Sequence, residues 1–189
     1  MNKLLLHCCC GPCAVGSLPL FYAAGYAVTG CFYNPNIHPY TEQQARLASF
    51  RLTMEQEGLP YLLDNAYPLE TWLAAVAADP QHRCTYCYQS RLRYTAELAA
   101  EQGFEAFSTT LLISPYQQHD FLHELGNQLA AEYGVSFAYL DLRPRFREGQ
   151  REARQRGLYL QKYCGCIYSE KERYLSQPAK KNKQTGEVR

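Results

Sequence analysis

The sequence predicts an α/β fold of three layers, in which helices cover both faces of a doubly wound, mainly parallel sheet of about five strands. Short apolar segments rich in β-branched and aromatic residues alternate with helical segments of roughly 10–18 residues, which is typical of β-α-β crossovers. The 189-residue chain is 47% hydrophobic and 20% charged, so it can bury a core without disulfide bonds. We expect one α/β domain over residues 1–177 and a disordered basic tail over 178–189.

The first half of the chain has the clearest pattern. We expect strands at residues 3–8, 26–33 and 60–63, and helices at residues 14–24, 41–57 and 69–78. Gly11-Pro12 separates the first strand from the first helix, and Thr41 with Gln44 matches a capping box at the start of the second helix. The loop Asn34-Pro-Asn-Ile-His-Pro39 ends the second strand, because its composition is that of a turn.

The second half continues the alternation as far as residue 142. We expect helices at residues 84–102 and 121–133, and strands at residues 104–113 and 136–142. Beyond residue 142 the pattern assigns only a Cys-x-Cys pair and a basic segment. In parallel sheets, functional loops follow the carboxyl ends of the strands. We therefore expect residues 8–13, 34–38 and 114–117 to meet at one edge of the sheet.

Nothing in the sequence indicates a membrane or secreted protein. The apolar runs are far shorter than the ~20 residues of a membrane span, and Met1 is not followed by a signal peptide. We expect a cytoplasmic, monomeric protein without a membrane partner. The charge is uneven, since residues 1–142 carry six basic and 13 acidic residues (net −7) and residues 143–189 carry 13 and five (net +8). This asymmetry indicates a region that binds a polyanion.

Nine cysteines are unusual in a chain of this size, and most of them lie in short groups. Because the number is odd and the compartment is reducing, metal or redox chemistry explains them better than a disulfide framework. The two largest groups are Cys8-Cys9-Cys10-Gly-Pro-Cys13 and Cys84-Thr-Tyr-Cys87. Two cysteines from each would supply the four thiolates of a 4Fe–4S cluster, with zinc as the competing metal. Cys84 and Cys87 begin a helix, where the helix dipole favours the thiolate.

The remaining cysteines suggest other chemistry. Cys10-Gly-Pro-Cys13 also matches the active-site tetrapeptide of thioredoxin, so a thiol–disulfide oxidoreductase is one alternative function, and a zinc-stabilised tRNA-binding module is another. Cys164-Gly-Cys166 is interpreted as a redox-active dithiol, because a disulfide across one residue closes a tight and labile ring. Its alternatives are two more metal ligands or two free thiols. Cys31 stands alone in a strand and is expected to be a small buried apolar residue.

Four motifs, taken in their order and spacing, resemble the QueH family of epoxyqueuosine reductases. They are His7-Cys-Cys-Cys-Gly-Pro-Cys13, Tyr33-Asn-Pro-Asn-Ile-His-Pro39, Arg83-Cys-Thr-Tyr-Cys87 and Tyr163-Cys-Gly-Cys166. The resemblance covers residues 3 to about 175 and implies a nucleotide-hydrolase (HUP-like) fold with a 4Fe–4S cluster. It also implies the last step of queuosine biosynthesis, the two-electron removal of the epoxide oxygen from epoxyqueuosine at the wobble position of tRNA. The partners would be a tRNA bearing that base in its anticodon loop and an electron donor.

The resemblance also assigns roles to individual cysteines. Cys9, Cys10, Cys84 and Cys87 match the ligands of the 4Fe–4S cluster, and Cys164 and Cys166 match a redox-active disulfide pair. Cys13 falls where some members carry Asp, a position associated with a second, mononuclear iron. Cys8 lies outside the family pattern and receives no role.

Two further sets of residues complete the expected site. Candidate proton donors are Tyr33, His38 and Glu42, which lie on or just after the loop that ends the second strand. Candidate tRNA contacts are basic residues interleaved with aromatic ones, because arginine binds phosphate and aromatic rings stack on unpaired bases. They are Arg143, Arg145, Arg147, Arg151 and Arg154.

Overall fold

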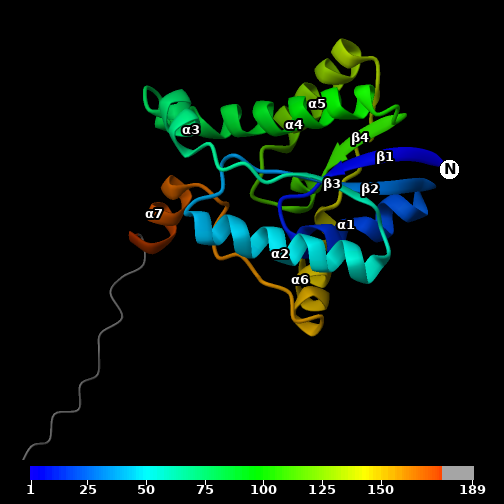
Figure 1. The fold of residues 1–189 in the computed structure, drawn as a ribbon, viewed down its shortest axis with the longest axis horizontal. Coiled ribbons are helices and arrows are strands. Elements are labelled where there is room, and N and C mark those ends of the chain that lie inside the picture. The colour runs from blue at the N-terminus through cyan, green and yellow to red at the C-terminus, as the bar shows by residue number, and fades with distance from the viewer. Residues whose placement is uncertain (176–189) are drawn as a thin grey trace, which may run out of the picture.

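A five-stranded sheet forms the centre of the computed structural model, which describes residues 1–175 (Figure 1). The tail expected at 178–189 lies outside these residues. Every pair of neighbouring strands is parallel and the order is β3-β2-β1-β4-β5, which confirms the predicted sheet. The strands are β1 (Asn2–His7), β2 (Tyr26–Tyr33), β3 (Tyr61–Asp64), β4 (Ala106–Thr109) and β5 (Ser136–Phe137).

Helices cover both faces of this sheet and complete the three layers. In Figure 1, α4 and α5 lie on one side, and α1, α2 and α6 lie on the other. The α-helices are α1 (Gly11–Ala23), α2 (Tyr40–Glu57), α3 (Leu69–Val76), α4 (Arg83–Glu101), α5 (His119–Tyr133), α6 (Phe146–Gln155) and α7 (Ile167–Leu175). Three short 3-10 turns are η1 (Pro80–His82), η2 (Thr110–Ile113) and η3 (Arg143–Arg145).

The core is built around β1, the central strand. Leu4, Leu5 and Leu6 are all fully buried, although consecutive side chains in a strand point to opposite faces. Both faces of β1 are therefore covered, which is typical of parallel sheets and explains why the strand is continuously apolar. Among the described residues, no helix is both long and apolar enough to cross a membrane.

The first two helices begin earlier than expected. α1 starts at Gly11 rather than residue 14, because proline is compatible with the first helical turn and Pro12 occupies it. As a result, Cys10 caps the helix and Cys13 lies in its first turn. α2 starts at Tyr40, and its N-cap is Pro39 without a side-chain hydrogen bond, so the capping box assigned to Thr41 and Gln44 was wrong.

The last two strands are shorter than expected. β4 ends at Thr109, whose hydroxyl accepts a hydrogen bond of 3.1 Å from the Leu111 amide and turns the chain into η2. β5 has only two residues. The sequence pattern also gave no sign of α6 and α7. α6 buries only Gly149 and Ala153, and after Phe146 its other residues are all polar or charged.

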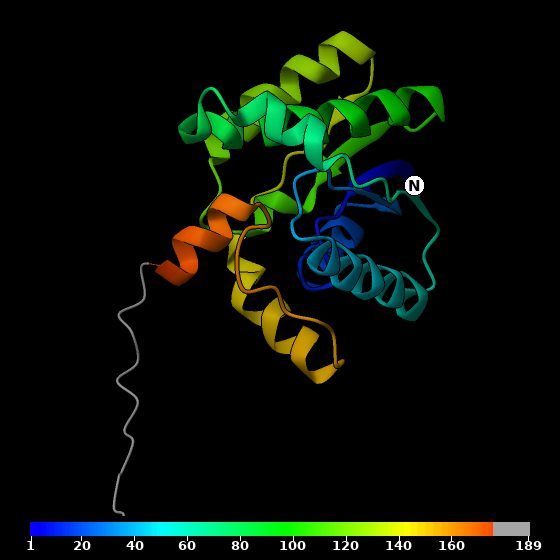
Figure 2. The same cartoon turned by 60° about the vertical axis from the view of Figure 1, so that its left-hand side comes forward.

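α6 packs closely against α1 through two glycines. A Cβ atom added to Gly149 would lie 2.6 Å from the Cα atom of Gly16, closer than real side chains approach. This contact fixes the basic helix α6 beside the first turn of α1, where Cys13 lies. Figure 2 shows α6 and α7 together on one side of the sheet, joined by a segment that passes the start of α2.

Candidate functional site

The three expected loops meet at the carboxyl edge of the sheet, between β1 and β4, where the strand order reverses. The Asn34 side-chain amide, after β2, donates a 3.0 Å hydrogen bond to the Cys8 carbonyl, after β1. Cys9 and Gln117, from the loops after β1 and η2, line one cavity. The predicted convergence is therefore confirmed, at the position where doubly wound sheets place their ligand sites.

Cys9, Cys10 and Cys13 form the first cysteine group. Their sulfur atoms all lie within 4.8 Å of one another, and Cys9 Sγ is 3.6 Å from Cys10 Sγ. The strand end and the first turn of α1 hold these residues, so their spacing follows from regular backbone geometry. Among the described residues, these are the only three His, Cys, Asp or Glu side chains whose ligand atoms approach so closely.

The three thiols of the first group differ in their pKa values. Hydrogen bonds from Cys10 and Cys13 hold the pKa of Cys9 well below its usual range, and the nearby Arg46 guanidinium acts in the same direction. Burial raises the pKa of Cys10, and hydrogen bonds with Cys10 and Cys9 raise that of Cys13. Cys9 is therefore the most acidic thiol of the group, and the hydrogen bonds from its two neighbours stabilise its thiolate form. Three buried sulfurs at this spacing fit a thiophilic metal such as iron or zinc.

Side chains from distant segments donate to these sulfurs. The Thr110 hydroxyl lies 3.7 Å from Cys9 Sγ, and the Gln161 amide nitrogen lies 3.6 Å from Cys13 Sγ. The Gln161 amide oxygen is buried and has no hydrogen-bond partner among the described residues. Donors around a thiolate stabilise its charge and tune the metal that it binds.

The second cysteine group joins the start of α4 to the segment before α7. Cys84, Cys87, Cys164 and Cys166 line one cavity of about 160 Å³. Cys87 and Cys166 pack in a small buried cluster with Trp72, whose indole N–H donates to Cys87 Sγ at 3.3 Å.

The pKa values of Cys84 and Cys87, in the second group, differ from expectation. Burial raises the pKa of Cys87 to about 11, and burial also raises that of Cys84. The two residues do begin a helix, as predicted. The expected net shift of these two residues toward the thiolate is nevertheless wrong, because desolvation by burial disfavours the charged form and outweighs the helix dipole.

The proposed cluster ligands are divided between these two groups. Cys9 and Cys10 belong to the first group, whereas Cys84 and Cys87 lie with Cys164 and Cys166. A 4Fe–4S cluster takes each thiolate on a different iron, so its ligands need not approach as closely as those of a single ion.

Cys164 connects the two groups. It lines the 160 Å³ cavity and also a larger cavity of about 470 Å³ that reaches Cys9 and Cys13. Its thiol is exposed and lies 3.9 Å from the Gln117 amide nitrogen, while the Gln117 amide oxygen accepts a 2.8 Å hydrogen bond from Tyr88. The larger cavity is of the size that binds small molecules. Another cavity, of about 540 Å³, opens at the opposite edge of the sheet and contains no cysteine.

Both thiols of the Cys164–Cys166 pair are free in this structure. Cys166 is buried and makes two contacts with Ser169. The Ser169 amide lies 3.4 Å from Cys166 Sγ, and the Ser169 hydroxyl donates to the Cys166 carbonyl at 2.7 Å. Gly165 between them has φ of +153°, a conformation that L side chains rarely adopt. The pair therefore has one accessible and one protected sulfur.

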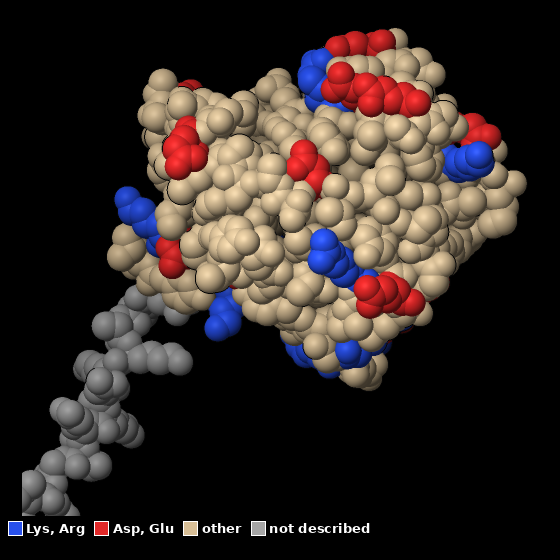
Figure 3. Space-filling view, in the orientation of Figure 1, with Lys and Arg blue, Asp and Glu red and all other residues tan. Residues whose placement is uncertain are grey.

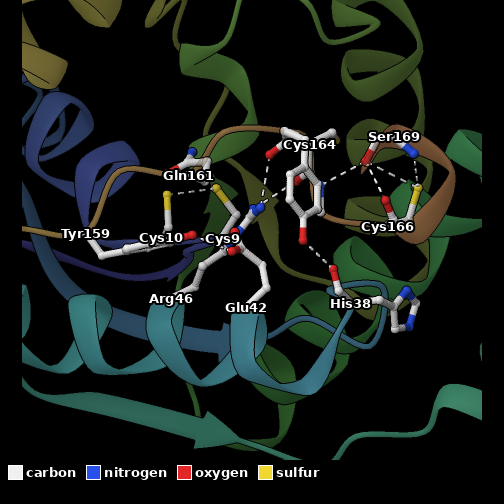
Figure 4. A network of polar contacts seen from close by, with 12 residues as sticks. Cys9, Cys10, His38, Glu42, Arg46, Tyr159, Gln161, Cys164, Cys166 and Ser169 are labelled. Carbon is white, nitrogen blue, oxygen red and sulfur yellow. Dashed lines mark hydrogen bonds and ion pairs between the residues drawn. The ribbon is translucent and has the colours of Figure 1, made fainter. Parts of the chain in front are cut away.

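A buried ion pair lies beside both groups and was not predicted. Glu42 and Arg46, one turn apart on α2, are 2.8 Å apart, and only 8% and 1% of their side chains are exposed. Figure 4 shows Arg46 pointing from α2 toward the segment that carries Cys164. A periodicity test could have found it, because Arg46 shares a helix face with the buried residues Gln43, Phe50 and Met54.

The three candidate proton donors lie in different surroundings. The Tyr33 ring stacks on Tyr94, with a centroid separation of 3.9 Å. The His38 ring is buried against Trp72, and burial lowers its pKa to about 4, so it is neutral at pH 7. Glu42 accepts a hydrogen bond from Tyr159 in addition to its contact with Arg46. Glu42 is thus the candidate whose side chain contacts the cysteine segment, through Tyr159.

The candidate tRNA contacts divide into paired and unpaired arginines. Arg143 pairs with Asp141 at 2.7 Å, and Arg145 pairs with Glu148 at 2.5 Å. The other three are exposed and lie three or four residues apart on one face of α6, without an ion-pair partner among the described residues. They are Arg147, Arg151 and Arg154. On the face shown in Figure 3, basic side chains are scattered, and most have acidic neighbours.

Cys8 and Cys31 lie outside both cysteine groups. Both are fully buried in the main hydrophobic core, and burial raises the pKa of each thiol. Their packing agrees with the apolar role expected for Cys31. It gives Cys8, which received no role, the same function.

Comparisons with known proteins agree with these motifs. The profile of the family described as "Epoxyqueuosine reductase QueH" matches residues 4–172. A protein named epoxyqueuosine reductase QueH from Dehalococcoides mccartyi is 41% identical over 172 residues, covering 91% of this chain and 94% of the relative. One of the same name from Thermotoga maritima is 31% identical, covering 92% of this chain and 93% of the relative.

A solved structure of low sequence identity shares this fold. A predicted subunit of a tRNA methyltransferase from Methanocaldococcus jannaschii superposes with a TM-score of 0.54, at 10% identity, covering 80% of this chain and 77% of that one. This likeness concerns the fold alone. The family profile and the relatives, which match along nearly the whole described length, show that this chain belongs to the QueH family.

Proposed function

We propose that this protein is an epoxyqueuosine reductase, an oxidoreductase that acts in the cytoplasm on tRNA and completes queuosine biosynthesis. The observation that carries the proposal is the position of Cys164, an exposed thiol in the wall shared by a cavity of about 470 Å³ and the second cysteine group. A redox thiol beside a cavity large enough for a modified base suits a reductase of that base. The names of the relatives support the same reaction.

The thiol content of the site favours a metal cofactor. We propose that Cys9, Cys10, Cys84 and Cys87 hold a 4Fe–4S cluster and that Cys13 holds a second iron. Such a cluster would supply one-electron transfer, and an iron with an open position would act as a Lewis acid on oxygen. The donors at Cys9, Cys13 and Cys87 described above would stabilise the bound thiolates.

The dithiol balances the electrons and protons of the reaction. Conversion of an epoxide to an alkene consumes two electrons and two protons, breaks two C–O bonds and releases water. Oxidation of Cys164 and Cys166 to a disulfide releases two electrons and two protons as the S–S bond forms. The sum is epoxide plus dithiol giving alkene, water and disulfide. An external thiol reductant would then regenerate the dithiol by exchange at the exposed sulfur of Cys164.

Proton delivery is assigned to the loop after β2 and the start of α2. Of Tyr33, His38 and Glu42, we favour Glu42, whose carboxylate would pass on a proton taken from the Tyr159 hydroxyl that donates to it next to the cysteine segment. The neutral imidazole of His38 lies buried against Trp72. Tyr33 is engaged in stacking.

The rim of the larger cavity suits a nucleotide. Tyr116 is 83% exposed at the rim and packs edge-on against Phe146, at a centroid distance of 6.1 Å. Lys162 and Arg173 line the same cavity. An exposed ring offers a stacking surface for a base from the anticodon loop, and the basic side chains offer phosphate contacts. The exposed arginines of α6 would extend these contacts along the tRNA backbone.

The test is anaerobic purification with iron and sulfide analysis, followed by an assay on tRNA that contains epoxyqueuosine. We expect about four irons or more per chain, absorption near ~400 nm, and formation of queuosine, detected by mass spectrometry of digested tRNA. Cys84→Ser should lose the cluster, whereas the matched control Cys31→Ser, a cysteine outside both groups, should keep it. Bound tRNA without turnover, together with stoichiometric zinc, would support the zinc-stabilised tRNA-binding module instead.

The thiol–disulfide oxidoreductase is the other alternative outcome. An active but colourless protein that reduces disulfides through Cys10 and Cys13 would support it. The full burial of Cys10 disfavours this function, because thiol–disulfide exchange requires an accessible attacking sulfur.

A further inference from the structure

Burial of the Arg46 side chain removes its charge from water, and its contacts must offset the free energy of that desolvation. Only 1% of its side chain is exposed. Its three nitrogens each have a partner: Nε donates to Glu42 Oε1 at 2.8 Å, Nη1 to the Cys164 carbonyl at 2.8 Å, and Nη2 to the Tyr163 carbonyl at 2.9 Å. A forked guanidinium therefore binds two consecutive peptide carbonyls that lie more than a hundred residues away in sequence.

The segment that Arg46 holds has little structure of its own. Residues 158–166 form neither helix nor strand, so contacts with the rest of the protein set their conformation. The Gly165 carbonyl accepts a 2.8 Å hydrogen bond from the His38 amide, and the Tyr163 hydroxyl donates to the His38 carbonyl at 2.6 Å. Together with the two bonds from Arg46, these contacts engage the carbonyls of three successive residues, as the close view in Figure 4 illustrates.

Glu42 fixes the orientation of the guanidinium. One carboxylate oxygen binds Arg46 and the other accepts from Tyr159, which belongs to the same segment. The guanidinium carbon also lies 5.7 Å from the centre of the Tyr163 ring. The arginine is thus held from α2 and from the segment at the same time.

From these contacts we infer that Arg46 is a positioning residue for the Cys164–Cys166 dithiol. By fixing the peptide carbonyls on the N-terminal side of Gly165, it keeps Cys164 in the wall of the larger cavity while Cys166 remains buried beside Cys87. The redox role of the dithiol rests on the proposed function, but the positioning does not. Without the fork, the carbonyls of Tyr163 and Cys164 would lose their two bonds to Arg46, and Cys164 would sample other directions.

The test compares Arg46→Lys and Arg46→Met with Thr53→Val in anaerobically purified protein. Lysine keeps the charge but cannot bind two carbonyls as a fork. Thr53 is a matched control, because its buried hydroxyl donates within α2, to the Ser49 carbonyl at 2.9 Å, and is outside the Arg46 network. The first readout is hydrogen–deuterium exchange of peptides that cover residues 34–40 and 158–166. The second is the alkylation rate of Cys164, followed by peptide mass spectrometry.

In Arg46→Met, we expect the exchange rates of both peptides and the alkylation rate of Cys164 to change at least tenfold. The change should be smaller in Arg46→Lys. In Thr53→Val, both rates should stay within twofold of those of the natural protein. With the tRNA substrate, kcat should fall at least tenfold while KM stays within twofold. Unchanged exchange and alkylation in Arg46→Lys and Arg46→Met would overturn the inference. If Arg46→Met does not fold, Arg46→Lys decides it. Absence of reductase activity in the natural protein would overturn the proposed function alone, since exchange and alkylation still report on the positioning.

Discussion

Residues 1–142 and residues 143–175 place their cysteines by different means. In the first region, which we call the frame, the end of β1 and the first turn of α1 hold Cys9, Cys10 and Cys13. The second region is the described part of the C-terminal quarter of the chain (residues 143–189). In it, Cys164 and Cys166 lie before α7, on a segment bound to the frame by side-chain and loop hydrogen bonds. Regular backbone geometry thus sets the positions of Cys9, Cys10 and Cys13, and tertiary contacts set those of Cys164 and Cys166.

This difference has consequences for substitutions. A change in the buried frame should alter the free energy of unfolding before it alters catalysis. A change on the exposed surface of the C-terminal quarter should do the reverse, because few apolar contacts depend on it. The charge follows the same division, since the frame carries the net negative charge and the C-terminal part of the chain carries the positive charge.

The largest expected effect comes from a pair of serine substitutions that separates the two regions. Cys164→Ser should reduce kcat by roughly 1,000-fold or more, because it removes an electron source, and should leave stability within about 0.5 kcal/mol. Cys31→Ser should keep activity but lose about 1–3 kcal/mol of stability, because it buries a hydroxyl in the core. Reductase assays and urea unfolding measure both. Substantial activity in Cys164→Ser would remove the dithiol from the mechanism.

The next effect concerns tRNA binding by the C-terminal quarter. Replacing Arg147, Arg151 and Arg154 together by alanine should weaken binding about 10- to 100-fold at 0.15 M salt and reduce the slope of log K against log salt by about two to three. The double variant of Arg143 and Arg145 is the control, and it should change the slope much less, because those charges are already paired. Equal slopes for the two variants would show that α6 does not face the tRNA.

A third prediction tests whether the C-terminal quarter also contains a position that controls stability. Gly149→Ala should destabilise the protein by about 1–3 kcal/mol, because the new methyl group would meet the Cα atom of Gly16 in α1. Gln155→Ala, on the exposed end of α6, is the control and should be nearly neutral. Urea unfolding decides between them. Full stability of Gly149→Ala would mean that α6 shifts easily, and the contrast with the frame would become sharper.

The smallest effect is a pH dependence that originates in the frame. His38 is neutral when folded, because burial lowers its pKa from 6.5 to about 4. The unfolded chain therefore binds its proton more tightly, and the stabilising effect of neutral His38 is lost as the pH falls from about 6.5 toward 4. Between pH 7 and pH 5 this loss should amount to about 1–2 kcal/mol. In His38→Phe the unfolding free energy should depend less on pH by that amount; an unchanged dependence would contradict the assignment.

Much of the frame was predictable from sequence because its local and tertiary signals agree. The continuously apolar residues Leu4 to Leu6 predicted a buried parallel strand, and β2 occupies the expected residues 26–33. The convergence of three loops followed from strand direction alone. The errors fall where side-chain chemistry redirects the chain, as at Pro12 in the first turn of α1 and at Thr109 before η2.

The site was less predictable, because its second half depends on contacts between distant segments. The motifs identified the cysteines, but no local pattern shows that Arg46 binds the carbonyls of residues 163 and 164. Nor could spacing show that burial, rather than the helix dipole, controls the pKa of Cys87. α6 escaped prediction because glycine, not a large apolar residue, forms its contact with α1.

The nine thiols differ in exposure, and this difference predicts the order in which air oxidises them. Cys164 is exposed, Cys84 is half-buried, and the other seven are buried. Peroxide should therefore reach Cys164 first and oxidise it to a sulfenic acid, which a neighbouring thiol converts to a disulfide with loss of water. Cys166, two residues away, is the nearest such thiol in sequence. The most exposed thiol in the molecule thus lies near a second thiol that can trap its sulfenic acid as a disulfide. Thiol reductants would then reverse the oxidation caused by a brief exposure to oxygen.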